Sequence, residues 1–186
     1  MKVVPKDVLG AIQDGQIHTL TKGFGLGGGI GYGKSCAISA LLKLGLARWA
    51  HASSSGWDFR PTSRRTPVIS WVNWPNTADQ LQQLATNGNA VHSLMYAIKG
   101  ANILVIDDLG KERLPVIRED RSIPFCQAQL DIIIDFRNGH RLPTLWTTNV
   151  DEKSLVAVYG PATYTRLIQD NPIDWVGARL RNLRLQ

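Results

Sequence analysis

The chain has 186 residues, 44% of them hydrophobic, with a formal net charge of +6 and a sequence pI of about 9.6. This length suits one domain. No segment approaches the roughly 18 apolar residues that span a bilayer, and the N-terminus lacks the apolar core of a signal peptide. We therefore expect a cytoplasmic protein with no membrane partner, and the positive charge favours an anionic partner, nucleic acid first.

In the first third of the chain, apolar spacing predicts a helix, a strand and a second helix. The first helix covers residues 5–13, and strand-like residues follow from 17 to 26. The second helix, residues 36–50, is amphipathic. Five of its side chains are expected in the core: Ile38, Leu41, Leu42, Leu44 and Leu46. Residues 51–66 are rich in Ser, Gly, Pro and Arg and indicate an exposed loop.

The rest of the chain alternates strands with helices. Strands are predicted at residues 67–74, 101–107 and 143–148. Helices are predicted at residues 77–85, 89–99, 125–137, 154–158 and 161–169. Thr77 is a candidate N-cap, and the charged segment 111–124 is expected to be irregular. This alternation predicts a parallel sheet with helices on both faces, whose ligands bind beyond the carboxyl ends of the strands.

The run GGIGYGKS, residues 28–35, fits the phosphate-binding pattern G-x-x-x-x-G-K-[ST] between a predicted strand and a predicted helix. Its glycines let backbone N–H groups surround a polyphosphate, and the helix N-terminus adds a favourable dipole. Lys34 supplies a positive charge to the β- and γ-phosphates, and Ser35 can hold Mg²⁺. The candidate nucleotide-binding residues are Gly28, Gly29, Ile30, Gly31, Tyr32, Gly33, Lys34, Ser35 and Cys36.

Polar residues follow two later strands. Asp107 and Asp108 end the apolar strand ILVI, where Asp107 can hold Mg²⁺ opposite Ser35 and Asp108 can polarise an attacking water. Asn149 follows the strand LPTLWTT, near the expected position of the γ-phosphate. Asn149 can also be read as a turn residue or as a helix cap before Asp151.

Cys36 and Cys126 are too few for a disulfide framework or a zinc site. We expect both to be small buried or half-buried side chains.

Three segments together resemble a known family. They are the GGIGYGKS loop, the stretch VIDDLGKE at residues 105–112, and the pattern from Leu130 through Arg137 to LPTLWTTN at 142–149. With the T-R-L at residues 165–167 and the G-x-x-x-R at 177–181, the chain resembles the DnaC/IstB-type branch of the AAA+ ATPases. That branch includes bacterial and phage helicase loaders and ATPases that assist transposases. The resemblance covers roughly residues 15–185.

The resemblance implies an α/β, three-layer P-loop NTPase fold of AAA+ type with a small C-terminal helical lid. Residues 1–15 would form a lead-in helix and residues 16–186 a single ATPase domain. Because only 27 residues precede Gly28, we expect the separate N-terminal domain of cellular helicase loaders to be missing.

The resemblance also implies roles for individual residues. Lys34, Asp107, Asp108 and Asn149 would be catalytic, with Ser35 and Asp107 at Mg²⁺. Arg166 would be an arginine finger that reaches a neighbouring subunit's site, so the chain would self-associate; an exposed helix arginine is the alternative. Arg181 would be a second nucleotide sensor, although Arg179 and Arg184 lie close to it in sequence.

Two basic segments are candidate DNA contacts. The first carries Arg60, Arg64 and Arg65 beside Trp57 and Phe59, a combination that suits phosphate contact and base stacking. The second contains four basic residues, Lys111, Arg113, Arg118 and Arg121. Each segment can also be a solvated charged loop, and the contacts would be to phosphates, without base specificity.

These observations predict a protein that binds ATP and Mg²⁺ and hydrolyses ATP slowly. We expect it to act on DNA, and to prefer single-stranded to duplex DNA. The expected role is loading a replicative helicase. Two alternatives stay open: an ATPase that assists a transposase on duplex DNA, and a nucleotide-gated binding module with negligible turnover. A small-molecule kinase fits less well, and a GTPase is disfavoured because the sequence has no N-K-x-D.

Overall fold

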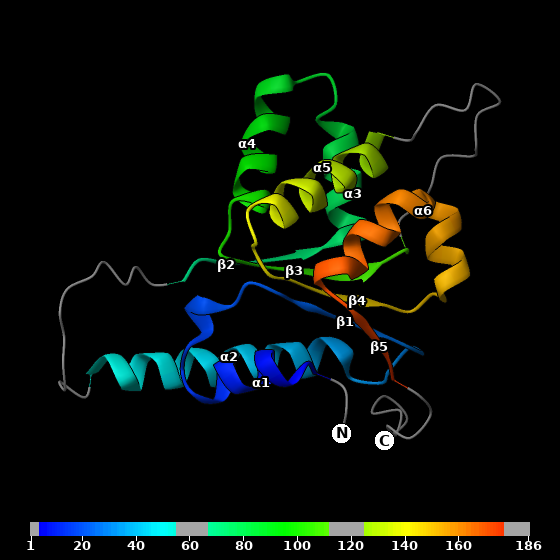
Figure 1. The fold of residues 1–186 in the computed structure, drawn as a ribbon. Helices are drawn as coiled ribbons and strands as arrows, with labels where there is room; N and C mark the ends of the chain where they lie inside the picture. Colours follow the sequence, from blue (N-terminus) through cyan, green and yellow to red (C-terminus); the bar gives the residue numbers. More distant parts are fainter. Residues whose placement is uncertain (1–3, 55–66, 112–124, 177–186) are drawn as a thin grey trace.

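A parallel five-stranded sheet lies between two layers of helices in the computed structural model of the chain, which describes residues 4–54, 67–111 and 125–176 (Figure 1). The strand order is β2-β3-β4-β1-β5. In that order the strands are β2 (Ile69–Asn73), β3 (Ile103–Leu109), β4 (Thr144–Thr148), β1 (Phe24–Gly27) and β5 (Ile173–Trp175). Every pairing is parallel, so the carboxyl ends of all five strands lie at one edge of the sheet.

Two hydrophobic cores lie on the two faces of the sheet. Strand β3 supplies both, because Ile103 and Val105 point to one face and Leu104 and Ile106 to the other. The helices α1 (Lys6–Gln13) and α2 (Lys34–Ser54) cover the first face (Figure 1). Four helices cover the second face: α3 (Trp74–Gln83), α4 (Gly88–Lys99), α5 (Phe125–Gly139) and α6 (Glu152–Asp170). Near-continuous apolar strands are typical of a sheet buried on both faces.

The N-terminal helix α1 is part of the core that it forms with α2 on the first face of the sheet. Val8 and Ile12 of α1 are buried in the same cluster as Ile38 and Leu42 of α2. Leu44, which we expected in the core, is 40% exposed, because it lies on the side of α2 that faces away from the sheet. Among the described helices, none combines the length and the apolar content needed to cross a bilayer.

Several element boundaries differ from the sequence prediction. The predicted strand 17–26 is a short 3-10 helix (Ile17–Thr19) followed by β1. The helix α3 begins at Trp74, with Pro75 in its first turn, and its N-cap is Asn73 rather than Thr77. The Asn73 side chain accepts a hydrogen bond from the Asn76 backbone N–H at 3.4 Å. Strand β5 was not predicted, because three residues carry too little pattern to be recognised.

The two short helices predicted near residues 154–169 form one kinked helix, α6. Gly160 has φ 78° and ψ 157°, and Pro161 follows it. Only glycine adopts such a conformation readily, and proline cannot donate the hydrogen bond that would continue the first segment. The kink therefore lies between the two helices that the sequence predicted.

The predicted C-terminal lid would fall after residue 176, outside the described residues.

A buried arginine joins three elements at the edge of the sheet where the strands begin. Arg137 of α5 is fully buried and donates to Thr144 Oγ1 at 2.9 Å and to Pro143 O at 2.6 Å. It also donates to Ala101 O at 2.8 Å and Lys99 O at 3.0 Å. Burial lowers the pKa of the guanidinium to about 10, so it remains charged at neutral pH. Its planar fork satisfies four oxygens from the starts of β3 and β4 and from the end of α4.

We expect Arg137→Lys to lower the free energy of unfolding by about 2–3 kcal/mol, because a lysine keeps the charge but leaves buried carbonyls without donors. Urea unfolding monitored by circular dichroism measures this change. Arg141→Lys, at an exposed position, is the control and should change stability by less than about 0.5 kcal/mol. Equal stability of the two variants would contradict this role for Arg137.

Candidate functional site

The glycine-rich loop connects the end of β1 to the start of α2. Gly28, Gly31 and Gly33 have φ values of 138°, 85° and 72°, a region that L-residues with side chains rarely adopt. A Cβ atom at Gly28 would also lie 2.5 Å from Val176 O. The loop therefore requires glycine for its backbone path and for the close approach of the segment after β5. The helix α2 begins at Lys34, directly after the loop.

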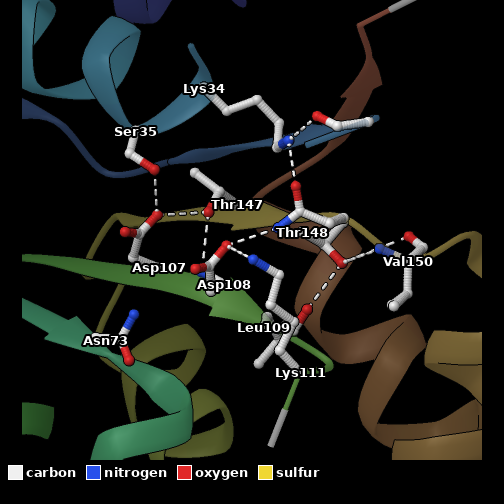
Figure 2. Close-up of polar contacts among 12 residues, drawn as sticks. Lys34, Ser35, Asn73, Asp107, Asp108, Leu109, Lys111, Thr147, Thr148 and Val150 are labelled. Atoms are coloured by element: carbon white, nitrogen blue, oxygen red, sulfur yellow. Dashed lines mark hydrogen bonds and ion pairs between the residues drawn. The ribbon is translucent and has the colours of Figure 1, made fainter. Parts of the chain in front are cut away.

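The side chain of Lys34 lies inside this loop, only 6% exposed. Its ammonium group donates to the carbonyl oxygens of Gly28 and Gly29, both at 2.8 Å. It also donates to Asn149 Oδ1 at 2.7 Å (Figure 2). The lysine thus connects the loop after β1 with the residue that follows β4.

A chain of short hydrogen bonds links Ser35 to the acidic end of β3. Ser35 Oγ donates to Asp107 Oδ1 at 2.6 Å, and Thr147 Oγ1 donates to the same oxygen at 2.6 Å (Figure 2). Thr147 Oγ1 in turn accepts from the Asp108 backbone N–H at 2.9 Å. Because β4 lies between β1 and β3, its threonine can contact both acidic residues.

Asp107 and Asp108 have different environments, although they are adjacent in sequence. Asp108 has φ 63°, and the pairing of β3 with β4 shifts register between Ile106 and Leu109. The Asp108 carboxylate oxygen Oδ1 accepts from Asn149 Nδ2 at 2.6 Å and from Lys111 Nζ at 2.8 Å. The two carboxylates therefore contact different partners, and a positive φ at a non-glycine residue is often found at functional sites.

These side chains line a pocket of about 320 Å³ at the carboxyl edge of the sheet. Its lining residues are Ile30, Gly31, Gly33, Lys34, Ser35, Cys36, Asp107, Asp108, Lys111 and Asn149. The structure therefore brings together residues from three separate predicted segments. The helix cap before α6 is Asp151, which accepts from the Ser154 backbone N–H at 2.8 Å. Asn149 is not that cap, and its side chain contacts Lys34 and Asp108 instead.

Other predicted residues lie elsewhere. Arg166 is in the last third of α6 and makes an ion pair with Asp131 of α5, at 2.8 Å and 3.1 Å to its two oxygens. Cys36 is exposed rather than half-buried, whereas Cys126 is buried as expected. Six predicted DNA contacts, Arg60, Arg64, Arg65, Arg113, Arg118 and Arg121, lie outside the described residues, and so does Arg181. Lys111, predicted as a DNA contact, lines the pocket.

The sequence did not indicate that two further residues, Thr147 and Lys111, belong to this site. Thr147 was only part of the family pattern T-T-N, but its hydroxyl joins Asp107 to the Asp108 backbone. The signal that could have identified Thr147 is its position at the carboxyl end of β4, a buried strand next to β3, which carries Asp107 and Asp108. Lys111 was grouped with the basic segment that follows it, although it stands three residues after Asp108, within reach of a turn.

Neither a protein-family model nor a curated protein matches the chain. Solved structures do resemble it. They include the DnaC helicase loader (19% identity, TM-score 0.64, covering 86% of this chain and 81% of that chain). DnaI is similar (20% identity, TM-score 0.59, 92% and 80% covered). DnaA from Aquifex aeolicus, bound to AMPPCP, is 12% identical with a TM-score of 0.60, and this chain spans only 47% of it.

These similarities establish the fold. The predicted α/β, three-layer P-loop fold with a parallel sheet is confirmed, and the chain is similar in three dimensions to the DnaC helicase loader and to DnaI, as the short sequence motifs indicated. At identities of 19–20%, activity and partners do not follow from the similarity alone.

We expect Thr147→Val to lower the affinity for Mg²⁺-ATP by about tenfold, because it removes the hydroxyl that orients Asp107. Titration calorimetry with and without Mg²⁺ measures the effect. Thr163→Val is the control, because Thr163 is also a buried threonine and its hydroxyl donates to Asp131 Oδ1 at 2.9 Å, not to a residue of the pocket. Equal losses of affinity in both variants would mean that Thr147 only stabilises the fold.

Proposed function

We propose that the protein binds and hydrolyses ATP with Mg²⁺ and acts on DNA, in a role like that of a helicase loader. One observation carries the proposal. Lys34, Ser35, Asp107, Asp108 and Asn149 come from three different segments and line one pocket at the carboxyl edge of a parallel sheet. The pocket has the groups that a nucleoside triphosphate requires, namely a glycine loop, a buried ammonium group and a pair of carboxylates.

The residues present suit Mg²⁺. The Ser35 hydroxyl and the Asp107 carboxylate meet at 2.6 Å, and such hard oxygen donors are the ligands that Mg²⁺ prefers. Within the described residues, no cluster of three or more His, Cys, Asp or Glu side chains is able to hold a metal by itself. This agrees with Mg²⁺, which is usually held by one or two protein groups together with water and substrate phosphates. When bound, the ion would neutralise charge on the phosphates.

The other residues of the pocket have separate roles in ATP hydrolysis. Lys34 binds the β- and γ-phosphates, and Asn149 contacts the γ-phosphate. Asp108 orients a water whose oxygen bonds to the γ-phosphorus while the bond from this phosphorus to the β–γ bridging oxygen breaks. The products are ADP, inorganic phosphate and a proton. The roles rest on the contacts among these side chains and on the resemblance to the AAA+ ATPases.

We propose that Arg166 acts on another copy of the chain. The helix α6 leaves the carboxyl edge of the sheet after β4 and returns to the opposite edge, where β5 begins. Near the end of α6, the carbonyl of Arg166 accepts from Asn138 Nδ2, in the last turn of α5, the helix that precedes β4. Arg166 therefore lies at the far edge from the pocket of its own chain. An arginine that stabilises the transferred phosphoryl group would have to come from a neighbouring copy.

The experiment that tests the function is the ATPase rate against protein concentration, without DNA, with single-stranded DNA and with duplex DNA, at two salt concentrations. A rate that rises with concentration and with single-stranded DNA supports a loader-like ATPase. A preference for duplex DNA favours a transposase-assisting ATPase. A rate that is negligible under all conditions, with ATP still bound, identifies a nucleotide-gated binding module. The two salt concentrations measure the phosphate contribution to DNA binding.

We expect Lys34→Ala to weaken ATP binding by about a hundredfold and to remove turnover, because it deletes the charge that meets the phosphates. Circular dichroism should show an unchanged fold. Lys153→Ala, an exposed residue of α6, is the control and should behave as the wild type. Unchanged ATP affinity and rate in Lys34→Ala would refute the assignment of the pocket.

We expect Arg166→Ala to leave ATP affinity unchanged in dilute protein and to remove the concentration-dependent part of the ATPase rate. The side chain is 44% exposed in its ion pair with Asp131, and exposed pairs contribute less than about 1 kcal/mol, so the variant should fold. Arg48→Ala on α2 controls for loss of an exposed arginine. If dilute Arg166→Ala lost ATP binding as well, Arg166 would act within its own chain.

A further inference from the structure

The pocket contains a second lysine that the functional proposal does not use. Lys111 lies just after β3, its side chain is 34% exposed, and it lines the same pocket as Lys34. We infer that Lys111 recognises the γ-phosphate of the bound nucleotide and, in doing so, releases Asp108. This inference rests on the proposed function and names a residue that would discriminate the triphosphate from the diphosphate.

Four side chains form a continuous bridge across the pocket. Lys34 donates to Asn149 Oδ1 at 2.7 Å, and Asn149 donates to Asp108 Oδ1 at 2.6 Å. Lys111 donates to this same oxygen of Asp108 at 2.8 Å (Figure 2). The two ammonium groups are therefore joined through an amide and a carboxylate. An anion that enters between Lys34 and Lys111 competes with Asn149 Oδ1 and Asp108 Oδ1 for the two ammonium groups.

The charges of the pocket support a phosphate at this position. Among the described residues, the charged side chains that line it are two lysines, Lys34 and Lys111, and two aspartates, Asp107 and Asp108. A γ-phosphate adds negative charge close to Asp108, and like charges at this distance repel each other unless a cation lies between them. Lys111 is the cation in contact with Asp108. ADP lacks the γ-phosphate, so with ADP bound the contact between Lys111 and Asp108 would persist.

A tight turn fixes the position of Lys111. Gly110 has φ 89°, and the Lys111 backbone N–H donates to Asp108 O at 3.3 Å. The Gly110 backbone N–H donates to the Tyr159 hydroxyl at 2.9 Å, and Thr148 Oγ1 donates to Leu109 O. The backbone is thus held to β4 and α6. The four-carbon stem of lysine leaves the ammonium group able to move from one oxygen acceptor to another.

When Lys111 leaves Asp108 for the γ-phosphate, the Asp108 carboxylate also loses one of its hydrogen-bond donors. In the present structure, Asp108 Oδ1 accepts from both Lys111 and Asn149, and a carboxylate oxygen engaged by two donors is a poor acceptor for a water. When Lys111 moves to the γ-phosphate, which Lys34 also contacts, Asp108 Oδ1 can accept a hydrogen bond from the attacking water. The triphosphate would thereby prepare the group that acts on it.

Binding of an ATP analogue with a non-hydrolysable β–γ bond, compared with binding of ADP, tests the inference by titration calorimetry on the full chain with Mg²⁺. In Lys111→Ala we expect about tenfold weaker binding of the analogue, since one charge-assisted contact is lost, and ADP affinity within about twofold of wild type. Lys111→Arg should recover most of the affinity for the analogue. Lys43→Ala, on the exposed side of α2, should change neither affinity.

Unchanged binding of both nucleotides by Lys111→Ala, or an equal loss of both, would overturn the inference. If Lys111→Ala bound the analogue and ADP as the wild type does but lost affinity for single-stranded DNA, Lys111 would be a DNA contact. Equal loss of both nucleotides would make its role structural. The proposed function is tested separately by the wild type and Lys34→Ala. Failure of the wild type to bind either nucleotide would overturn the function itself, whereas normal wild-type binding with an unaffected Lys111→Ala overturns only this inference.

Discussion

The position of β4 between β1 and β3 is the constraint on which the site depends. Because the three strands are parallel, the glycine loop, the two aspartates and Asn149 all emerge at the same edge. Thr147 of β4 then lies between the glycine loop after β1 and the aspartates of β3, and its hydroxyl donates to Asp107. A different strand order would separate Lys34 from Asn149, and the sequence motifs would remain without forming a pocket.

The opposite edge of the sheet is held by buried polar groups. Arg137 satisfies carbonyls at the starts of β3 and β4, and Asn171 accepts from the backbone N–H groups of Gly23 and Thr144. Buried and fully bonded polar groups fix the positions of strands more specifically than apolar packing does. The edge where the strands begin is therefore held by buried polar groups, while the opposite edge carries the charged side chains of the pocket.

Much of the fold was predictable because its signals are local. The apolar runs of β3 and β4, the spacing in α4 and α5, and the break at Gly160 and Pro161 all follow from side-chain periodicity and from backbone restrictions. The errors came where tertiary contacts override local pattern. Leu44 fits the apolar stripe of α2 but faces away from the sheet. Strand β5 exists because it pairs with β1, and its three residues carry no pattern of their own.

The glycine loop, Lys34 and Ser35 could be identified from the sequence, since their spacing fixes a local backbone path. The sequence also identified Asp107, Asp108 and Asn149 as polar residues at the ends of buried strands. The contacts among these side chains depend on the packing of the whole chain. The left-handed backbone of Asp108 turns its carboxylate toward Asn149 and Lys111, and α6 carries Arg166 to the far edge of the sheet. Contacts between segments as distant as Lys34 and Asn149 depend on strand order and register, which no local spacing encodes.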